Sequence, residues 1–239
     1  PIEKLLIDSV VLAKKADGKS NPFFPKPLNI YNKLPDKRIN SRGLDLTDEL
    51  TLNLLQTGLN NLNKKKYSAH PLIAHHKAES EEAFKVINPA DNGDIVGKVI
   101  KTTLKEVEVA ITKAIKGFES WSNVEPNERA NKLLKMADLI EENYFDLINL
   151  LVREAGKTIN NAVGEIREAV DFCRYYANQV INEFSNDTHQ PLGVFVCISP
   201  WNFPLAIFIG EISSAIVTGN SAIAKPSDQS KLFQKKGGC

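Results

Sequence analysis

The chain has 239 residues, of which 42% are hydrophobic and 25% charged, and its formal net charge at pH 7 is +1. This length and composition are typical of a globular protein with one large or two small domains. Because the charges nearly balance, no overall field would attract nucleic acid or anionic lipid, and we expect no polyanionic partner.

The sequence predicts neither a membrane span nor a secreted protein. The most apolar region, residues 192–219, is interrupted by two prolines, an asparagine and a glutamate, so it lacks the roughly 20 consecutive apolar residues of a spanning helix. The chain starts at Pro1 without a methionine or a signal peptide, and we expect it to begin inside a longer chain. Its three cysteines form no C-x-x-C pair, and its four histidines have no partners at metal-ligand spacing. We therefore expect a reducing, cytoplasmic setting with no disulfide and no metal site.

Residues 1–67 form an irregular arm in our interpretation. Four prolines between residues 22 and 35 interrupt helices and favour extended chain. Further along, four leucines recur at helical spacing after an acidic turn, which predicts one short amphipathic helix. These leucines are Leu52, Leu55, Leu59 and Leu62. The basic run NKKKY that follows them is interpreted as a solvated helix end.

The next region is predicted to combine a hairpin with helices. Residues 83–103, AFKVINPADNGDIVGKVIKTT, alternate apolar and polar side chains around a turn at residues 89–93, which predicts a β-hairpin. Thr103 and Glu106 have the spacing of a capping box and predict a helix to about Gly117.

Three further apolar stripes predict helices whose buried faces form the core. The first begins with Pro126 at its first helical position. Its buried face is expected to hold Leu133, Ala137, Ile140 and Tyr144. The second stripe continues to a stop at Gly156, and the third runs from about Ile159 to Phe184.

Residues 192–227 predict a strand, a helix and a second strand. The apolar runs at 192–198 and 220–227 suit buried strands, and the segment 205–219 between them suits a helix that ends on glycine. A crossover of this length favours parallel neighbouring strands, and ligands of open α/β sheets bind at the carboxyl ends of such strands. Asn202 and Lys225 are therefore predicted at the same edge of one sheet.

The residues alone leave the role of this edge open. Pro200 and Pro204 would hold the amide of Asn202 in one orientation, and a fixed amide donor can stabilise negative charge that develops on a ligand oxygen. An asparagine in a turn more often satisfies backbone groups than it takes part in catalysis, and a lysine such as Lys225 is more often a surface cation than a cofactor ligand. Trp201 and Phe203 are expected in the core. Composition and spacing alone thus predict an α/β protein with a candidate site in the loop 199–204.

Residues 193–230, GVFVCISPWNFPLAIFIGEISSAIVTGNSAIAKPSDQS, resemble the cofactor-binding segment of the aldehyde dehydrogenase superfamily in order and spacing. Upstream segments resemble the opening hairpin and helices of that family, so the likeness covers about residues 68–230. The resemblance implies an α/β fold of N-terminal helices plus the first βαβ unit of an NAD-binding parallel sheet, cut short of the complete domain.

The arm narrows the resemblance. Its segments PIEKLLIDSV and INSRGLDLTDE are similar to the joining segment of the bifunctional proline-utilisation enzymes. In these, an FAD-dependent proline dehydrogenase precedes an NAD-dependent L-glutamate γ-semialdehyde (1-pyrroline-5-carboxylate) dehydrogenase. The resemblance implies a linker at 1–67, the first part of the aldehyde dehydrogenase domain at 68–230 and an atypical tail at 231–239. It also implies a homo-oligomeric, cytoplasmic bacterial enzyme, which other parts of the full-length protein could hold at the inner membrane.

The resemblance assigns roles residue by residue. Asn202 matches the asparagine whose amide binds the oxyanion formed when a cysteine thiolate attacks the aldehyde. The nicotinamide half of NAD is expected to lie beside Ile198, Ser199, Pro200 and Trp201. Lys225 matches the lysine that binds the adenosine ribose, with Ser227 and Asp228 nearby, although the family usually has glutamate in place of Asp228. Glu165 is expected to face the substrate entrance.

The rest of the family's catalytic machinery is expected beyond residue 230. That machinery consists of a glycine-rich cofactor turn, a glutamate base and the nucleophilic cysteine. Cys239 has the wrong spacing for the nucleophile, and Cys173 and Cys197 have apolar, core-like neighbours.

We therefore expect the chain alone to be inactive. The abrupt change at KLFQKKGGC suggests a frameshift or an early stop, and uncovered strands would favour oligomerisation or aggregation. Two other interpretations stay open: a non-catalytic association module, and a dehydrogenase of another aldehyde.

Overall fold

The computed structural model describes residues 2, 6, 8–17, 23–31, 37–78 and 82–232. Its contacts divide the chain into two units, Pro1–Asn40 and Ser41–Cys239. Within the first unit lie helix α1 (Ser9–Ala16) and a short 3-10 helix, η2 (Pro27–Asn29). Asp8 caps α1 by accepting a hydrogen bond from the backbone N–H of Val10 at 2.8 Å. No residue of α1 is buried, so this helix contributes nothing to a core within its own unit.

The second unit opens with the predicted amphipathic helix, which the structure confirms as α2 (Glu49–Leu62). Asp48 caps it by accepting from the backbone N–H of Thr51 at 2.9 Å. Leu55 is buried, and α2 packs against α5 (Tyr144–Ala155).

A three-stranded sheet in the order β1-β3-β2 follows. The predicted hairpin is confirmed, because β2 (Ala83–Asn88) and β3 (Asp91–Ile100) pair antiparallel around the turn. Strand β1 (Tyr67–Ala69), parallel to β3, was not predicted. Its approach requires Gly97, where a Cβ would come within 2.4 Å of the Tyr67 carbonyl oxygen.

The interpretation of the NKKKY run as a solvated helix end was incomplete. Lys65 Nζ lies 2.7 Å from a carboxylate oxygen of Asp146, and the Tyr67 hydroxyl donates to the other oxygen at 2.7 Å. Lys66 lies 3.4 Å from Asp94. These contacts to α5 and to the hairpin join residues far apart in sequence, which periodicity does not reveal.

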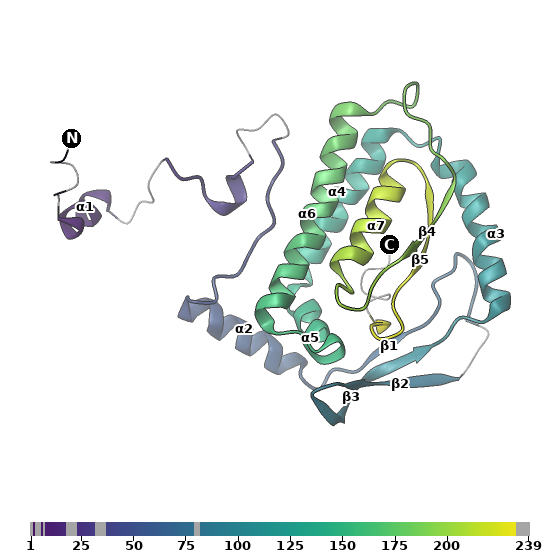
Figure 1. Cartoon of the computed structure of the whole chain (residues 1–239), viewed down its shortest axis with the longest axis horizontal. Coiled ribbons are helices and arrows are strands. Elements are labelled where there is room, and N and C mark those ends of the chain that lie inside the picture. Colours follow the sequence, from purple (N-terminus) through teal and green to yellow (C-terminus); the bar gives the residue numbers. More distant parts are fainter. Residues whose placement is uncertain are drawn as a thin grey trace. The chain divides into compact units, whose positions relative to one another are not determined.

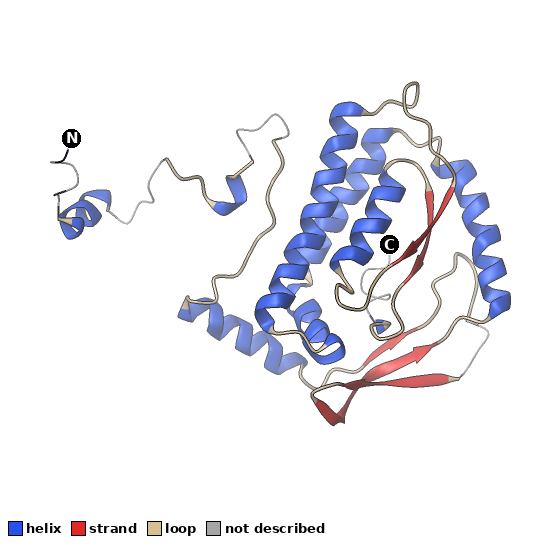
Figure 2. Ribbon diagram, viewed as in Figure 1, coloured by secondary structure: helices blue, strands red, loops and turns tan. Residues whose placement is uncertain are grey.

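Four helices form the body of the unit, namely α3 (Leu104–Trp121), α4 (Pro126–Glu142), α5 and α6 (Ile159–Glu183) (Figures 1 and 2). Both hydrogen bonds of the predicted capping box at Thr103 are present. Helix α3 continues past Gly117 to Trp121, whose indole N–H donates to the carbonyl of Ile216 at 2.7 Å. Tyr144 begins α5 instead of ending α4, because the chain bends at Asn143 between them.

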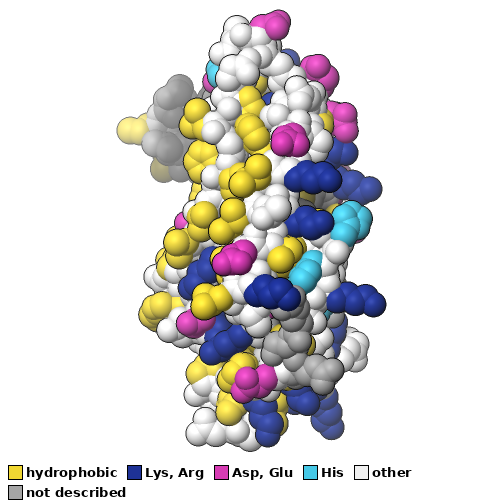
Figure 3. Space-filling view, turned by 90° about the vertical axis from the view of Figure 1, so that its right-hand side faces the viewer, with side chains coloured by type: hydrophobic (Ala, Val, Ile, Leu, Met, Phe, Trp, Pro, Cys, Tyr) yellow, Lys and Arg dark blue, Asp and Glu magenta, His cyan; other side chains and the backbone are white. Residues whose placement is uncertain are grey.

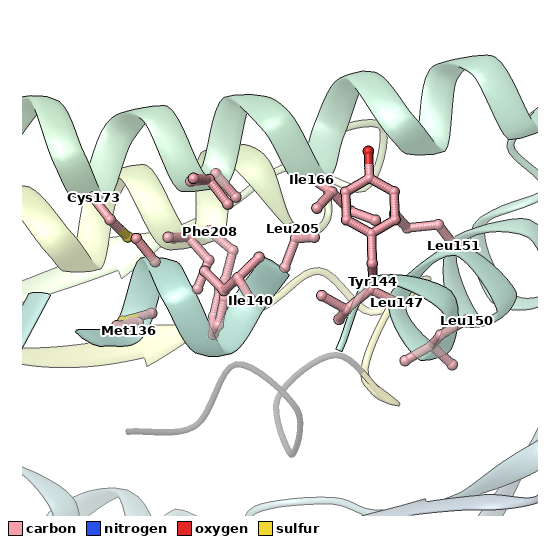
Figure 4. Packing of buried hydrophobic residues seen from close by; sticks show 14 of the residues in the cluster. Met136, Ile140, Tyr144, Leu147, Leu150, Leu151, Ile166, Cys173, Leu205 and Phe208 are labelled. Atoms are coloured by element: carbon pink, nitrogen blue, oxygen red, sulfur yellow. The ribbon is translucent and has the colours of Figure 1, made fainter. Parts of the chain in front are cut away.

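The predicted apolar stripes do form the core. In Figure 4, side chains from α4, α6 and the helix α7 (Ala206–Val217) point toward one another between the ribbons. Met136 and Ile140 come from α4, Ile166 and Cys173 from α6, and Phe208 from α7. All five are buried, and Cys173 is fully so, which confirms it as a packing residue.

Helix α3 carries an exposed apolar stripe. Its exposed hydrophobic residues are Leu104, Val107, Ile111 and Ile115. Figure 3 shows hydrophobic side chains along one side of the face that lies at the right of Figure 1, with mainly Lys and Arg on the other side.

Among the described residues, no helix is both long enough and apolar enough to cross a membrane.

The predicted strand, helix and strand are present as β4 (Val194–Ile198), α7 and β5 (Ser221–Lys225). The strands pair parallel, from Val194 beside Ser221 to Ile198 beside Lys225. The apolar run suits a strand that is buried in a complete sheet, but we expected uncovered strands in this chain alone, and β4 is uncovered: Val196 and Ile198 are 60% and 64% exposed. Within the described part of the chain, β4 and β5 form a sheet of two strands, so much of β4 is uncovered.

Candidate functional site

The candidate site lies at the carboxyl ends of β4 and β5. Ile198 and Lys225 are register partners there, and the backbone N–H of Ser199 donates to the Lys225 carbonyl at 3.2 Å. The loop 199–204 leaves this edge directly, and α7 begins at Ala206. The structure therefore brings the predicted loop and the predicted ribose-binding lysine to one sheet edge, as the strand pattern indicated.

The middle of the loop, residues 201–203, presents its side chains to the surface, whereas Ser199 and Pro204 at its ends are buried. Trp201 and Phe203 were expected in the core, yet they are 59% and 39% exposed. Asn202 between them is exposed as well. The loop projects past the strand end, and no other described element covers these rings fully. The exposed side chain of Asn202 is accessible to a ligand. Among the described residues its amide makes no hydrogen bond to the backbone of the turn, so the alternative structural role is not supported.

Glu165 of α6 contacts the backbone where this loop joins α7. Its side chain is 2% exposed and accepts hydrogen bonds from the backbone N–H groups of Leu205 and Ala206, at 3.0 and 3.1 Å. The Lys157 ammonium lies 2.5 Å from its other carboxylate oxygen. A carboxylate at the first amides of α7 satisfies donors that have no partner within the helix. Glu165 thus holds the start of α7 in place, and a contact with substrate stays a prediction.

Two serines lie close to the sheet edge. Ser199 is 5% exposed, and its hydroxyl oxygen has no hydrogen-bond partner among the described residues. The Ser227 hydroxyl accepts from the backbone N–H of Gln229 at 3.2 Å. Buried hydroxyl groups normally have hydrogen-bond partners, and a contact between Ser199 and the cofactor stays a prediction.

Two side chains predicted near the ribose, those of Lys225 and Asp228, differ in exposure and in ion pairing. Lys225 is exposed at the end of β5. Asp228 forms an ion pair with Lys231 at 3.3 Å, and the hydrogen bond from Lys231 lowers the pKa of the Asp228 carboxyl. The exposed ammonium of Lys225 fits a ligand with hydroxyl acceptors, while Asp228 already has a cationic partner.

Glu154, which the sequence did not single out, fixes the segment that follows β5. This residue of α5 is 5% exposed and accepts a hydrogen bond from the backbone N–H of Leu232 at 2.9 Å. Leu232 is itself 1% exposed, so the chain after Ser227 is anchored to the core. Burial raises the pKa of the Glu154 carboxyl to about 8, although the Leu232 amide and Lys231 act in the opposite direction.

We expect this carboxyl to make stability depend on pH. The folded state keeps the Glu154 proton up to about pH 8, whereas an unfolded chain releases it near 4.5. Its contribution is therefore complete below pH 4.5 and is lost as the pH rises toward 8. Urea unfolding from pH 5 to 8 should show a weaker loss of stability in Glu154→Gln than in the parent chain. Equal slopes for the two proteins would contradict this, and the exposed Glu128→Gln serves as the control.

The two cysteines in the described part of the chain are free and buried. Burial raises the pKa of the Cys197 thiol, which disfavours the thiolate that a nucleophile needs. Among residues 82–232 and the other described segments, no three histidine, cysteine or acidic side chains are placed to hold a metal. Cys239 and the rest of 233–239 in the predicted tail lie outside the described residues.

Comparison with known proteins gives the family. Residues 75–236 match the aldehyde dehydrogenase family, which is well over half of the chain. The chain belongs to the aldehyde dehydrogenase family. The matched residues include both the exposed loop with Asn202 and the lysine at the end of β5.

Relatives extend the likeness into the arm. The chain is 44% identical to the bifunctional protein PutA of Escherichia coli K12 over 243 residues, which cover 99% of this chain and 18% of that protein. A crystal structure of PutA from Bdellovibrio bacteriovorus superposes with a TM-score of 0.77 and 28% identity, covering 97% of this chain and 27% of the other.

A 1-pyrroline-5-carboxylate dehydrogenase that is not a PutA protein matches as well. The 1-pyrroline-5-carboxylate dehydrogenase from Thermus, solved with bound NAD, has a TM-score of 0.73 and 29% identity and covers 83% of this chain and 42% of the other. The chain therefore spans less than half the length of these relatives. These likenesses confirm the predicted α/β fold of a partial aldehyde dehydrogenase domain.

Proposed function

We propose that this chain is the first part of an enzyme that oxidises L-glutamate γ-semialdehyde, the open form of 1-pyrroline-5-carboxylate, to L-glutamate with NAD. The observation that carries this proposal is the 44% identity to PutA, which covers 99% of the chain and so includes the arm. A general aldehyde dehydrogenase would share only the family domain. In the full-length protein we expect an FAD-dependent proline dehydrogenase domain before this segment, a homo-oligomer and a cytoplasmic location.

The geometry supports different roles for Asn202 and Lys225 at the sheet edge. Asn202 is exposed and can donate its amide N–H to an oxygen that becomes negative during attack on the aldehyde. Lys225 is exposed on the neighbouring strand and can bind ribose hydroxyls. The exposed side chains of Ile198 and Trp201 lie at the same edge and can contact the cofactor. NAD, when bound, would accept the hydride of the aldehyde carbon.

The chain alone is proposed to be inactive. Aldehyde oxidation of this kind needs an accessible thiolate and a general base that activates water. Cys173 and Cys197 are 0% and 6% exposed, and neither lies in the loop 199–204. The nucleophile and the base are therefore expected in the part of the domain that this chain does not span.

Lys225→Ala tests the cofactor role. We would place it in a chimera in which this chain replaces the segment of E. coli PutA that it matches. Loss of a charge-assisted hydrogen bond should raise the KM for NAD about 10- to 100-fold. The KM for the aldehyde should change little.

The control is Lys132→Ala, which removes a half-exposed lysine of α4 that pairs only with Glu128 in the described structure. An unchanged KM for NAD in a folded Lys225→Ala chimera would contradict the assignment. If Asn202→Ala were also without effect, a non-catalytic association module would be the better interpretation.

A further inference from the structure

The only Asn-Gly pair of the sequence, Asn92 and Gly93, lies beside the turn of the β2–β3 hairpin. The ladder with β2 is interrupted after Asp91 and resumes at Ile95, so in the described structure residues 92–94 have no register partner on β2. These residues form a bulge whose backbone is not held by the ladder. Asn92 and Gly93 are also exposed to solvent.

The backbone N–H of Gly93 points at a carboxylate. It donates to an oxygen of Asp91 at 2.9 Å. A Cβ placed at Gly93 would come to 3.2 Å from the same oxygen, which is closer than most contacts of a Cβ. The missing side chain therefore leaves room for this hydrogen bond. Because Asn92 precedes Gly93 directly, the carbonyl carbon of its side chain, Cγ, can reach the Gly93 nitrogen by rotation of a few single bonds.

We infer that this segment modifies itself: the Gly93 nitrogen attacks Cγ of Asn92, with the Asp91 carboxylate as general base, and the asparagine becomes aspartate or isoaspartate. The new N–Cγ bond forms as the carboxylate takes the N–H proton. That proton passes to the side-chain nitrogen of Asn92, the bond from this nitrogen to Cγ breaks, and ammonia leaves. Water then opens the cyclic imide at either of its carbonyl carbons. Water is thus the only other reactant and ammonia the only other product.

The geometry favours this reaction at Asn92. Nucleophile and electrophile belong to adjacent residues, so the attack is intramolecular. A distance of 2.9 Å from the Gly93 nitrogen to the carboxylate oxygen is within the reach of a general base. The other nearby carboxylate, that of Asp94, is already engaged, because its two oxygens accept from Arg153 at 2.6 and 2.8 Å. Asp91 is therefore the base that the structure offers.

The same hairpin contains an internal control. Asn88 is followed by Pro89, whose nitrogen carries no hydrogen and cannot form the imide. The side-chain amide of Asn88 also donates to Asp94 at 3.2 Å. Tryptic cleavage after Lys85 and Lys98 releases both asparagines in one peptide. The inference does not depend on the aldehyde or the cofactor proposed above, so this peptide tests it separately.

The test incubates the 239-residue chain at neutral pH and follows this peptide by mass spectrometry, with a sample digested at once to measure conversion during handling. We expect aspartate and isoaspartate to accumulate at Asn92 while Asn88 stays unchanged. Asp91→Asn keeps an oxygen acceptor for the Gly93 N–H but removes the base, and should slow the conversion about tenfold or more. If Asn92 in the folded chain were as unreactive as Asn88, the inference would be overturned.

Two further variants keep the result decisive. Gly93→Ala suits the backbone, because the φ angle of Gly93 lies outside the left-handed region, but its Cβ crowds the Asp91 oxygen and should also slow the conversion. Asp187→Asn changes an exposed aspartate outside the hairpin and should leave the rate at Asn92 unchanged. Circular dichroism verifies that each variant is folded. Equal rates in the parent, Asp91→Asn and Gly93→Ala chains would overturn the role of Asp91.

Discussion

Asn202→Ala is expected to lower kcat of the chimeric enzyme by a factor of about 10² to 10³, the usual effect of removing one oxyanion donor. The amide is exposed and has no hydrogen bond among the described residues, so its loss should leave the fold intact. The KM for NAD should change little, because the residue acts on the aldehyde oxygen. Steady-state kinetics with varied aldehyde and varied NAD separate the two effects.

Asn60→Ala is the matched control for this experiment. Asn60 is an exposed asparagine of α2, remote in sequence from the loop, and its truncation should leave kcat unchanged. If Asn202→Ala retained the parent kcat in a folded chimera, Asn202 would be only a loop residue. The proposed oxyanion role would then be wrong.

Glu165→Ala is expected to destabilise the chain by about 3 kcal/mol, since it removes one partner of a buried ion pair. The substitution leaves the Lys157 ammonium and the amides of Leu205 and Ala206 without their carboxylate. Urea unfolding of the 239-residue chain measures the loss directly. Glu165→Gln keeps one oxygen acceptor for the α7 amides and should lose less stability than the alanine variant.

Glu128→Ala controls for the loss of any glutamate. Glu128 is exposed and pairs with Lys132 four residues away on α4, so its removal should change stability by about 0.5 kcal/mol or less. If Glu165→Ala were as stable as the parent but impaired aldehyde binding in the chimera, the residue would serve the substrate instead. The expectation from the sequence, that Glu165 faces the substrate entrance, would then be supported.

Much of the local structure could be predicted because single residues determine it. The capping box of Thr103, Pro126 at the start of α4 and Gly156 after α5 mark helix ends with groups that act within a few residues. The strand, helix and strand of residues 194–225 followed from apolar runs separated by proline and glycine. These signals are local, so no tertiary information was needed.

The remaining features depend on contacts between distant segments. Three residues are too few to show the alternation of a strand, and β1 exists because Gly97 lets Tyr67 approach β3. The positions of Glu165 below the loop and of Glu154 beside Leu232 likewise depend on helix packing. Trp201 and Phe203 were misplaced because an apolar residue in a loop gives no sign of whether another element covers it.

The activity of the chimera tests the central claim most directly. Formation of NADH from NAD and L-glutamate γ-semialdehyde should be measured for the chimera and for the 239-residue chain alone. We predict that the chimera forms NADH with this aldehyde and prefers it to simple aliphatic aldehydes, while the chain alone forms none. A folded chimera that is silent with this aldehyde, or NADH formation by the chain alone, would contradict the account.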